Sequence, residues 1–170
     1  LWAHEWAGMA PDIMAVAKAL GGGFPIGACL ASAKAAKGMT VGVHGSTFGG
    51  NPLAMAVGQK ALSLINSPET LNNVNEVAGY LKQQFAGLQE RFPDVIADVR
   101  GKGLLIGIKM VPNNREFMAL ARDTQRLLIA GGGDNCVRLL PPLNLTLDEA
   151  REAVARFEAA CEVAREKLAA

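Results

Sequence analysis

The sequence has few aromatic residues, few histidines and cysteines, and no excess of either charge. Its 170 residues include 17 basic and 16 acidic side chains, for a formal net charge of +1. This balance provides no overall field that would attract nucleic acid or an anionic membrane surface, so any anionic ligand must be held locally. We therefore expect small-molecule ligands, and neither a nucleic-acid nor a membrane partner.

The three cysteines, Cys29, Cys136 and Cys161, are widely spaced among apolar neighbours. An odd number at such spacing argues against a disulfide framework and against a zinc knuckle, which predicts no metal site and a reducing, cytoplasmic location. No segment has the uninterrupted run of about twenty apolar residues that a membrane-spanning helix needs. The chain also lacks an initiator Met and a signal peptide, and we expect it to begin inside a longer protein.

Half of the residues are apolar, which is enough to bury a core, and their pattern changes along the chain. The first fifty residues are rich in Gly and Ala. Their short apolar runs at 13–20 and 26–31 predict short buried strands of an α/β sheet. A capped helix from Asn51 to about Ile65 and a long amphipathic helix from Ser67 are predicted to follow.

The rest of the chain has the pattern of a small α+β domain. Its expected elements are a strand over 99–110, a helix over 116–130 and a strand over 136–140. Thr146 and Glu149 form a capping-box pair, which predicts the start of a last amphipathic helix. We expect a domain boundary near residue 93, giving domains 1–93 and 94–170.

Lys18 is the only charged side chain between Asp12 and Lys34, and a run of three glycines follows it at 21–23. Burial disfavours the ammonium form of a lysine and leaves a nucleophilic amine, which Schiff-base formation with an aldehyde cofactor requires. The alternative is a lysine whose stem lies along apolar surface with its head in water, and the local sequence by itself favours this alternative. The glycines lack the spacing of a nucleotide-binding loop.

Ser46 and Thr47 lie in a glycine-rich loop directly before the predicted helix start at Asn51. Free backbone N–H groups and hydroxyls in such a loop suit a phosphate or a carboxylate, and the helix dipole adds to the attraction. Alternatively, the hydroxyls bond to their own backbone. The loop alone leaves both interpretations open.

Arg138 lies in a short apolar strand, where a fixed cation is costly unless it is paired. An arginine in this position can bind a substrate carboxylate through two parallel hydrogen bonds. The alternative is an internal ion pair, and the strand pattern alone favours that alternative.

Taken together, these segments resemble the class III aminotransferases that depend on pyridoxal 5′-phosphate (PLP), and among them the bacterial acetylornithine aminotransferases. The motifs that carry the resemblance are Ala17-Lys18-Ala19-Leu20-Gly21-Gly22-Gly23, His44-Gly45-Ser46-Thr47-Phe48-Gly49-Gly50-Asn51-Pro52 and Val137-Arg138-Leu139. The resemblance implies the C-terminal portion of the large domain of a PLP fold-type I aminotransferase, followed by a small α+β domain.

The resemblance also implies roles for four residues. Lys18 would hold PLP as a Schiff base and then move a proton between the substrate and the cofactor. Thr47 would bind the PLP phosphate, Ser46 would lie beside the substrate, and Arg138 would bind a carboxylate of the amino acid or of 2-oxoglutarate. The implied reaction is transamination between N-acetylornithine and 2-oxoglutarate in arginine biosynthesis, in a homodimer with active sites at its interface.

Two alternatives stay open. One is another class III aminotransferase, acting on ornithine, succinylornithine or 4-aminobutyrate, and the other is a non-catalytic fragment that retains the fold. The family places the acid that pairs with the pyridinium nitrogen, the ring-stacking aromatic residue and the first phosphate loop upstream of Leu1. We therefore expect these 170 residues alone to have little or no transaminase activity, and a longer parent chain to be active.

Overall fold

The computed structural model describes residues 1–169, and the chain divides into two compact units, Leu1–Leu71 and Asn72–Ala170. The division falls before the boundary expected near residue 93. The reason is the long helix α4 (Pro68–Arg91), which buries one apolar face in the second unit. That face consists of Val77, Leu81, Phe85 and Leu88.

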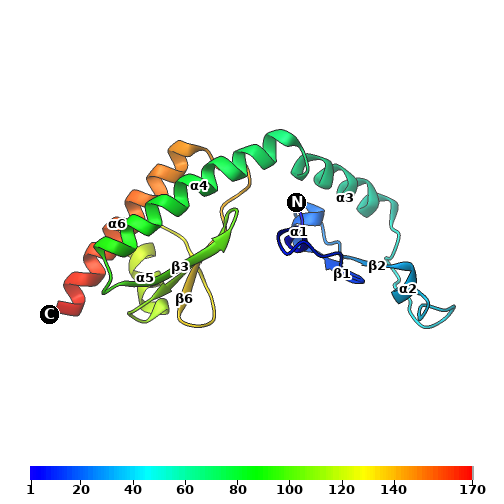
Figure 1. Cartoon of the computed structure of the whole chain (residues 1–170), viewed down its shortest axis with the longest axis horizontal. Coiled ribbons are helices and arrows are strands. Elements are labelled where there is room, and N and C mark those ends of the chain that lie inside the picture. Colours follow the sequence, from blue (N-terminus) through cyan, green and yellow to red (C-terminus); the bar gives the residue numbers. More distant parts are fainter. Residues whose placement is uncertain (170) are drawn as a thin grey trace. The chain divides into compact units, whose positions relative to one another are not determined.

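The N-terminal unit contains a two-stranded antiparallel sheet of β1 (Ile13–Val16) and β2 (Ala28–Ala31). The helices α1 (Ala3–Trp6) and α2 (Ala33–Ala36) have one turn each, and the 3-10 helix η1 (Lys18–Gly21) follows β1 (Figure 1). The apolar runs at 13–20 and 26–31 were predicted to form short buried strands. Instead, the strands are shorter than those runs and mostly exposed, and the end of the first run forms η1.

The helix α3 (Pro52–Ile65) agrees with its prediction from the sequence. Asn51 caps it, because its side-chain oxygen accepts hydrogen bonds from the N–H groups of Leu53 at 3.0 Å and Ala54 at 3.2 Å. Pro52 takes the first helical position, where its missing N–H costs no intrahelical hydrogen bond. These local interactions set the N-terminus of α3, which follows the loop that contains Ser46 and Thr47.

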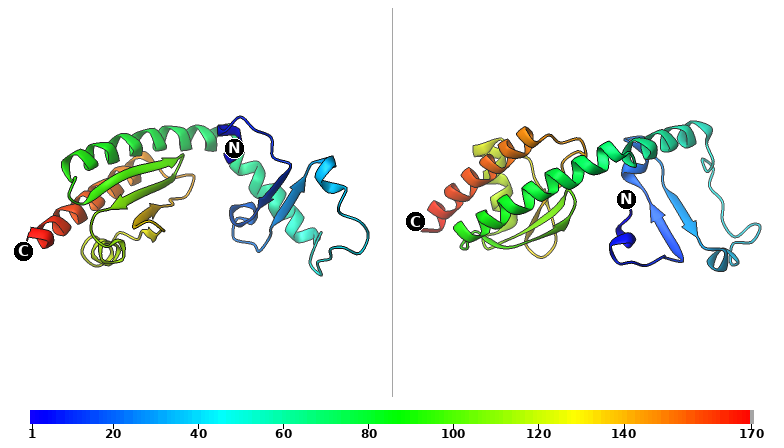
Figure 2. Two further views of the ribbon diagram at one scale, coloured as in Figure 1. Left: turned by 60° about the horizontal axis from the view of Figure 1, so that its bottom comes forward. Right: turned by 45° about the horizontal axis from the view of Figure 1, so that its top comes forward.

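The C-terminal unit is a four-stranded antiparallel sheet with helices packed against it. The sheet has the strand order β3-β4-β6-β5. Its elements after α4 are β3 (Ile96–Lys102), β4 (Leu105–Met110), α5 (Asn114–Gln125), β5 (Ala130–Gly131), β6 (Cys136–Leu139) and α6 (Leu147–Ala169). The helices α4 and α6 lie side by side in all three ribbon views (Figures 1 and 2).

The core of this unit forms around Phe157 of α6. Its ring lies 5.2 Å from the ring of Phe85 on α4, edge to face, and 5.2 Å from the ring of Phe117 on α5. All three rings are fully buried, and Ile108 and Val137 supply the buried face of the sheet beneath the helices. Such aromatic pairs contribute about 0.5–1.5 kcal/mol each beyond the area they bury.

Two elements of the C-terminal unit differ from their predictions. The strand expected over 99–110 is a hairpin, in which β3 turns into β4 at Gly103 (φ +53°). The helix expected over 116–130 begins at Asn114 and ends at Gln125, because Arg126 adopts a left-handed backbone with φ +51°. The strand expected over 136–140 is β6, and the predicted capping box opens α6.

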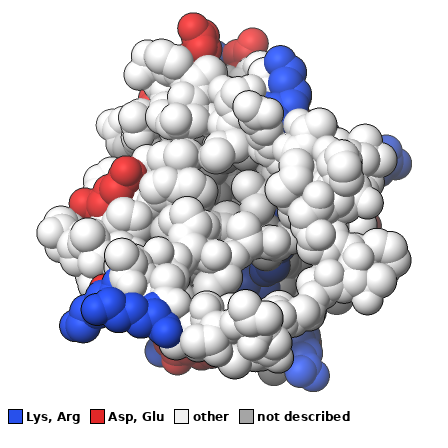
Figure 3. Space-filling view, turned by 90° about the vertical axis from the view of Figure 1, so that its right-hand side faces the viewer, with Lys and Arg blue, Asp and Glu red and all other residues white. Residues whose placement is uncertain are grey.

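The two units differ in how much apolar surface they bury. In the N-terminal unit only Gly21, Ala54 and Gly58 are buried, and many large apolar side chains are exposed. These include Trp6, Met9, Ile13, Leu30, Met39, Val41, Val43, Phe48 and Leu53. Figure 3 shows one face of the molecule on which uncharged side chains cover most of the area. Within the described residues, no helix combines the length and apolarity required to cross a membrane.

Candidate active site

Lys18 lies where β1 ends and η1 begins, and it has an unusual backbone. Its φ is +56°, in the left-handed region, whereas Ala17 before it is extended. A residue with a side chain pays about 1–2 kcal/mol to adopt this conformation, so the surrounding fold must hold it there. The side chain is exposed in this chain, in contrast to the burial expected from its apolar neighbours. The amine is therefore accessible from solvent.

The helix α3 supports the turn that carries Lys18. A Cβ added at Gly58 of α3 would lie 3.2 Å from Cδ1 of Ile26 and 3.7 Å from the carbonyl oxygen of Leu20. A Cβ added at Gly22 would lie 3.7 Å from Cβ of Ala61, also on α3. Small residues on both sides therefore let η1 approach the helix closely. This packing is what holds the backbone around Lys18.

Thr47 and Ser46 lie in the exposed loop before α3. The Ser46 carbonyl accepts a hydrogen bond from the N–H of Gly49 at 3.1 Å, which closes a turn around Thr47. Among the described residues, neither the hydroxyl nor the N–H of Thr47 has a hydrogen-bond partner. Thr47 thus presents two donors to a ligand. Two adjacent donors of this kind match the oxygens of a phosphate.

The first turn of α3 offers few free N–H groups to a ligand. As predicted, Asn51 caps the helix and accepts hydrogen bonds from the N–H groups of Leu53 and Ala54. The donors open to a ligand therefore belong to the loop and not to the first turn of the helix. The helix dipole still favours negative charge near this end.

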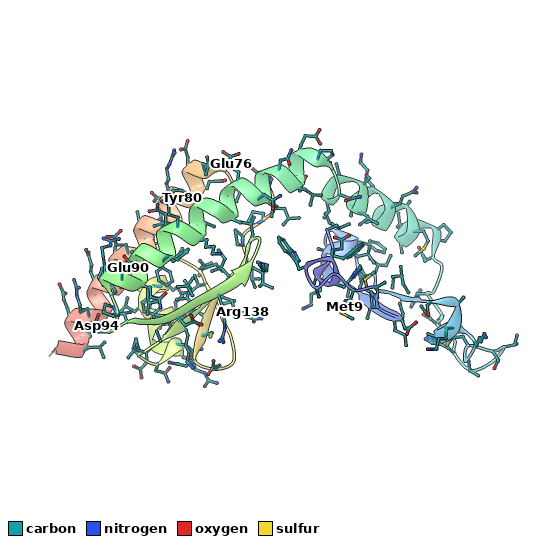
Figure 4. All side chains as sticks on the ribbon, in the orientation of Figure 1. Met9, Glu76, Tyr80, Glu90, Asp94 and Arg138 are labelled. Carbon is teal, nitrogen blue, oxygen red and sulfur yellow. The ribbon has the colours of Figure 1, made fainter. Side chains whose placement is uncertain are left out.

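Arg138 belongs to the C-terminal unit, in the middle of β6. It is exposed, and its Nε donates a hydrogen bond to the carbonyl oxygen of Gly131 at 2.9 Å. Among the described residues, no carboxylate forms an ion pair with it. The two terminal nitrogens of its guanidinium are left for a ligand. Figure 4 labels Arg138 on the sheet, on the side away from α4.

Two other cationic side chains on the same sheet, Lys109 and Arg100, form ion pairs with a carboxylate. Asp134 accepts hydrogen bonds from Lys109 at 2.9 Å and from Arg100 at 3.1 Å. These two hydrogen bonds, of which the one from Lys109 has the larger effect, hold the pKa of the Asp134 carboxyl below its ordinary value of 3.8. Arg138 is thus distinguished from Arg100 and Lys109 by its lack of a carboxylate partner.

No pattern in the sequence indicated how Arg138 is positioned. Its cross-strand neighbours are Gly107 on β4 and Ala130 on β5, both too small to cover the guanidinium. The carbonyl oxygen that accepts the hydrogen bond from its Nε belongs to Gly131, in a run of three glycines at 131–133 whose sequence predicts only a turn after a helix. One feature of the sequence could have indicated this arrangement: three glycines follow the predicted helix, whereas a single glycine is enough to end a helix.

Two of the three cysteines are buried in the C-terminal unit. Cys136 and Cys161 are buried free thiols, and burial raises the pKa of Cys161 to about 12. Cys29 is exposed on β2. Groups of three or more His, Cys, Asp or Glu side chains that could hold a metal ion are absent from the described part of the chain.

Comparisons with known proteins identify the family of the chain. Residues 1–161 match the family of class-III aminotransferases. Acetylornithine aminotransferase 2 of Caulobacter vibrioides is 72% identical over 100% of this chain and 42% of that protein. The crystal structure of N-acetylornithine aminotransferase from Stenotrophomonas maltophilia is 36% identical with a TM-score of 0.82, over 99% of this chain and 44% of that one.

An ornithine aminotransferase from Toxoplasma gondii, solved with partial occupancy of PLP at its active site, is also similar. It is 27% identical with a TM-score of 0.84, over 92% of this chain and 38% of that one. The chain spans 42% of the Caulobacter protein's length, so these relatives extend well beyond the matched region. The α/β fold expected from the sequence is confirmed. Because the family match covers residues 1–161 and the structures agree across nearly the whole chain, this chain belongs to the class-III aminotransferase family.

Proposed function

We propose that this chain is the C-terminal part of an enzyme that transaminates between N-acetylornithine and 2-oxoglutarate in arginine biosynthesis. The observation that carries the proposal is the identity of 72% to an acetylornithine aminotransferase over the whole chain. The free guanidinium of Arg138 supports it, because both substrates carry carboxylates that a guanidinium binds through paired hydrogen bonds.

The residues of the N-terminal unit fit PLP as the cofactor. Lys18 supplies an exposed primary amine for the cofactor's aldehyde, and Thr47 supplies a hydroxyl and an N–H without partners among the described residues for its phosphate. In the glycine run that follows Lys18, a Cβ added at Gly23 would meet nothing within 4 Å, so the backbone there faces open space. When bound, PLP supplies an electron-withdrawing ring that stabilises negative charge on the substrate carbon.

In this proposal the chain's own residues divide the work between binding and proton transfer. Lys18 would hold the cofactor through its amine, and the same amine would move a proton at the substrate carbon. Arg138 orients the substrate through its carboxylate, and Ser46 lies beside the substrate. Thr47 would hold the phosphate of the cofactor through its hydroxyl and N–H, which would limit the motion of the bound group.

The two units fit the end of a large PLP-binding domain and a small C-terminal domain. The exposed apolar side chains of the N-terminal unit, such as Phe48 and Leu53, support a larger assembly that covers them, and we propose a homodimer with active sites at its interface. Cysteines left as free thiols support a cytoplasmic location.

The second candidate is another class III aminotransferase, acting on ornithine, succinylornithine or 4-aminobutyrate. The structural match to an ornithine aminotransferase favours it, although at 27% identity against 72% for the acetylornithine relative. A non-catalytic fragment is the third candidate. It leaves unexplained why a lysine occupies a strained left-handed position that glycine would occupy at lower cost.

A chimera tests the proposal. The 170 residues replace the matched segment of the Caulobacter relative, and the purified protein is incubated with PLP, reduced with borohydride and digested for mass spectrometry. We expect the cofactor on Lys18, and turnover of N-acetylornithine with 2-oxoglutarate at a higher kcat/KM than ornithine or 4-aminobutyrate. The unaltered Caulobacter enzyme, assayed with the same substrates, shows what this chain contributes to the ranking.

Variants of the chimera separate the candidates. Lys18→Ala should abolish both turnover and trapping of the cofactor, and Thr47→Ala should weaken PLP binding. If the chimera folds but traps no cofactor on Lys18, the enzymatic assignment is wrong. If it prefers ornithine or 4-aminobutyrate where the Caulobacter enzyme does not, the substrate assignment is wrong and the second candidate takes its place.

A further inference from the structure

The three glycines before β6 differ in what surrounds them. A Cβ added at Gly132 would lie 3.3 Å from Cγ, 3.4 Å from Cδ and 3.5 Å from Nε of Arg138. At Gly131 the nearest atom would be Sδ of Met118 at 3.3 Å, and at Gly133 nothing lies within 4 Å. Only Gly132 therefore makes room for the side chain of Arg138.

The backbone of Gly132 is held from both sides. Its N–H donates to the carbonyl oxygen of Cys136 at 2.8 Å, and its own carbonyl accepts from Nδ2 of Asn114 at 3.3 Å. Asn114 also donates to the Cys136 carbonyl at 2.8 Å, which ties the start of α5 to the same turn. Because the turn is fixed in this way, a side chain at position 132 would displace Arg138 rather than the backbone.

The hydrogen bond of Arg138 lies next to this contact. Its Nε donates to the carbonyl oxygen of Gly131 at 2.9 Å, with the stem of the side chain passing over Gly132. A guanidinium anchored through Nε has its plane and direction fixed, and its two terminal nitrogens face outward together. Gly132 and Arg138 also line one pocket with Asn114 and Arg115, so this side of the turn is open to a ligand.

We propose that Gly132 is a positioning residue: its missing side chain lets Arg138 lie across the turn and present its guanidinium to a dicarboxylate such as 2-oxoglutarate. The inference rests on the proposed function for the identity of the ligand, but not for the geometry. Gly132 is not among the glycines with positive φ, so a side chain there would press against Arg138 without straining the backbone.

NMR of the 170-residue chain tests the geometry without any ligand. Arginine is labelled with ¹⁵N, and the Nε–H signal of Arg138 is assigned by its absence in Arg138→Lys. We expect this proton to exchange slowly with solvent in the wild type and in the matched control Gly133→Ala. In Gly132→Val it should exchange about tenfold faster, which corresponds to losing about 1.4 kcal/mol of protection. Equal exchange rates in Gly132→Val and the wild type would overturn the proposal.

A titration with glutarate, a dicarboxylate without the reactive keto group, tests the consequence for binding. We expect the Arg138 signal to shift with glutarate, and the Kd to rise about tenfold in Gly132→Val but not in Gly133→Ala, with thermal unfolding midpoints unchanged. In the Arg138→Lys background, Gly132→Val should have no further effect on Kd. A further increase in that background would show that Gly132 acts by another route, against the proposal.

The two measurements separate the failures. If the wild-type signal does not respond to glutarate, the carboxylate-binding role of Arg138 in the proposed function is wrong, and the exchange rates still decide whether Gly132 positions the guanidinium. If glutarate binds but Gly132→Val exchanges and binds like the wild type, the positioning role is wrong and the proposed function stands.

Discussion

At the scale of single residues, the backbone of Lys18 is the most unusual feature of the site. Its φ of +56° is a conformation that glycine adopts freely and other residues adopt at a cost. The amine of a lysine is nevertheless placed there. Strained backbone conformations of this kind are typical of functional sites, because the surrounding structure can hold a residue in them.

This feature predicts an unusual ranking of stabilities. Lys18→Gly should be more stable than Lys18→Ala by about 0.5–1 kcal/mol, because glycine relieves the left-handed strain but gains entropy in the unfolded chain. Trp2 and Trp6 are the only tryptophans, and both lie in the N-terminal unit, so urea unfolding followed by tryptophan fluorescence reports on it. As a control, Ala19→Gly should destabilise the same helix. Equal stability of the two Lys18 variants would contradict the prediction that the left-handed backbone at this position is strained.

Asp134 predicts a pH dependence. Its hydrogen bonds to Lys109 and Arg100 lower the pKa of its carboxyl, so the contribution of this carboxylate is present above pH 4 and is lost as the pH falls below its ordinary value of 3.8. Asp134→Asn removes the charge but keeps a side chain that tolerates the residue's φ of +56°. The Tm of the wild type should exceed that of Asp134→Asn at pH 7, and the difference should be smaller at pH 2.5, because the carboxylate is progressively protonated below pH 3.8.

Salt supplies the control for this comparison. Asp134, Lys109 and Arg100 are all exposed, so 1 M NaCl should reduce the difference at pH 7 by screening the ion pairs. A difference in Tm that is the same at both pH values and both salt concentrations would assign the effect of Asp134→Asn to the backbone instead.

At the scale of elements, the last helix depends on a reciprocal pair of side chains at its start. Thr146 accepts from the N–H of Glu149 at 3.2 Å, and the Glu149 carboxylate accepts from the N–H and hydroxyl of Thr146, both at 2.8 Å. Thr146→Ala should therefore lower the free energy of unfolding of the C-terminal unit by about 1 kcal/mol. Urea unfolding followed by circular dichroism at 222 nm measures this loss.

The conservative variant provides the comparison. Thr146→Ser keeps the hydroxyl and should lose only a small part of the stability that Thr146→Ala loses. If both variants lose the same amount, the methyl group and not the cap is responsible, and the hydrogen bonds of the capping box contribute nothing measurable.

Elements whose ends are coded by adjacent residues could be predicted from the sequence. Asn51 caps α3, Ser67 accepts from the N–H of Thr70 at the start of α4, and Thr146 caps α6. The hairpin of β3 and β4 could not be predicted in this way, because the turn depends on the backbone of Gly101 and Gly103 at positive φ. The apolar residues alternate on both sides of the turn, so the pattern over 99–110 predicted one strand and not two.

The candidate site was predicted only in part, for a similar reason. The environment of Arg138 is made by strands that are distant in the sequence, with Gly107 and Ala130 beside it and the Gly131 carbonyl beneath its Nε. No local pattern distinguishes an arginine in this setting from one in an internal ion pair. Lys18 was proposed as a site residue from its motif, whereas its exposure and its left-handed backbone depend on how η1 packs against α3.

At the scale of the whole molecule, apolar burial is distributed unevenly. The extended core of buried side chains, which includes Phe85, Phe117 and Phe157, lies entirely within Asn72–Ala170. In Leu1–Leu71 the buried positions are two glycines and one alanine. Since hydrophobic stabilisation scales with the apolar area removed from water, the C-terminal unit holds most of the chain's folding free energy.

This asymmetry predicts that the two units unfold separately. Tryptophan fluorescence reports on the N-terminal unit, whereas circular dichroism at 222 nm is dominated by α4, α5 and α6. In urea, the fluorescence transition should precede the circular dichroism transition, in violation of two-state behaviour. Amide hydrogens of β1 and β2 should exchange far faster than those of β4 and β6.

A pair of variants assigns each transition to its unit. Phe157→Ala should lower the free energy of unfolding measured from the circular dichroism transition by about 3–5 kcal/mol, because it removes the ring at the centre of the core of the C-terminal unit. The fluorescence transition should stay in place. Gly21→Ala places a Cβ 2.6 Å from Cγ2 of Ile26, and should shift only the fluorescence transition. Coincident transitions that both variants shift together would show that the chain unfolds as one cooperative body, since a local change would then destabilise both units equally.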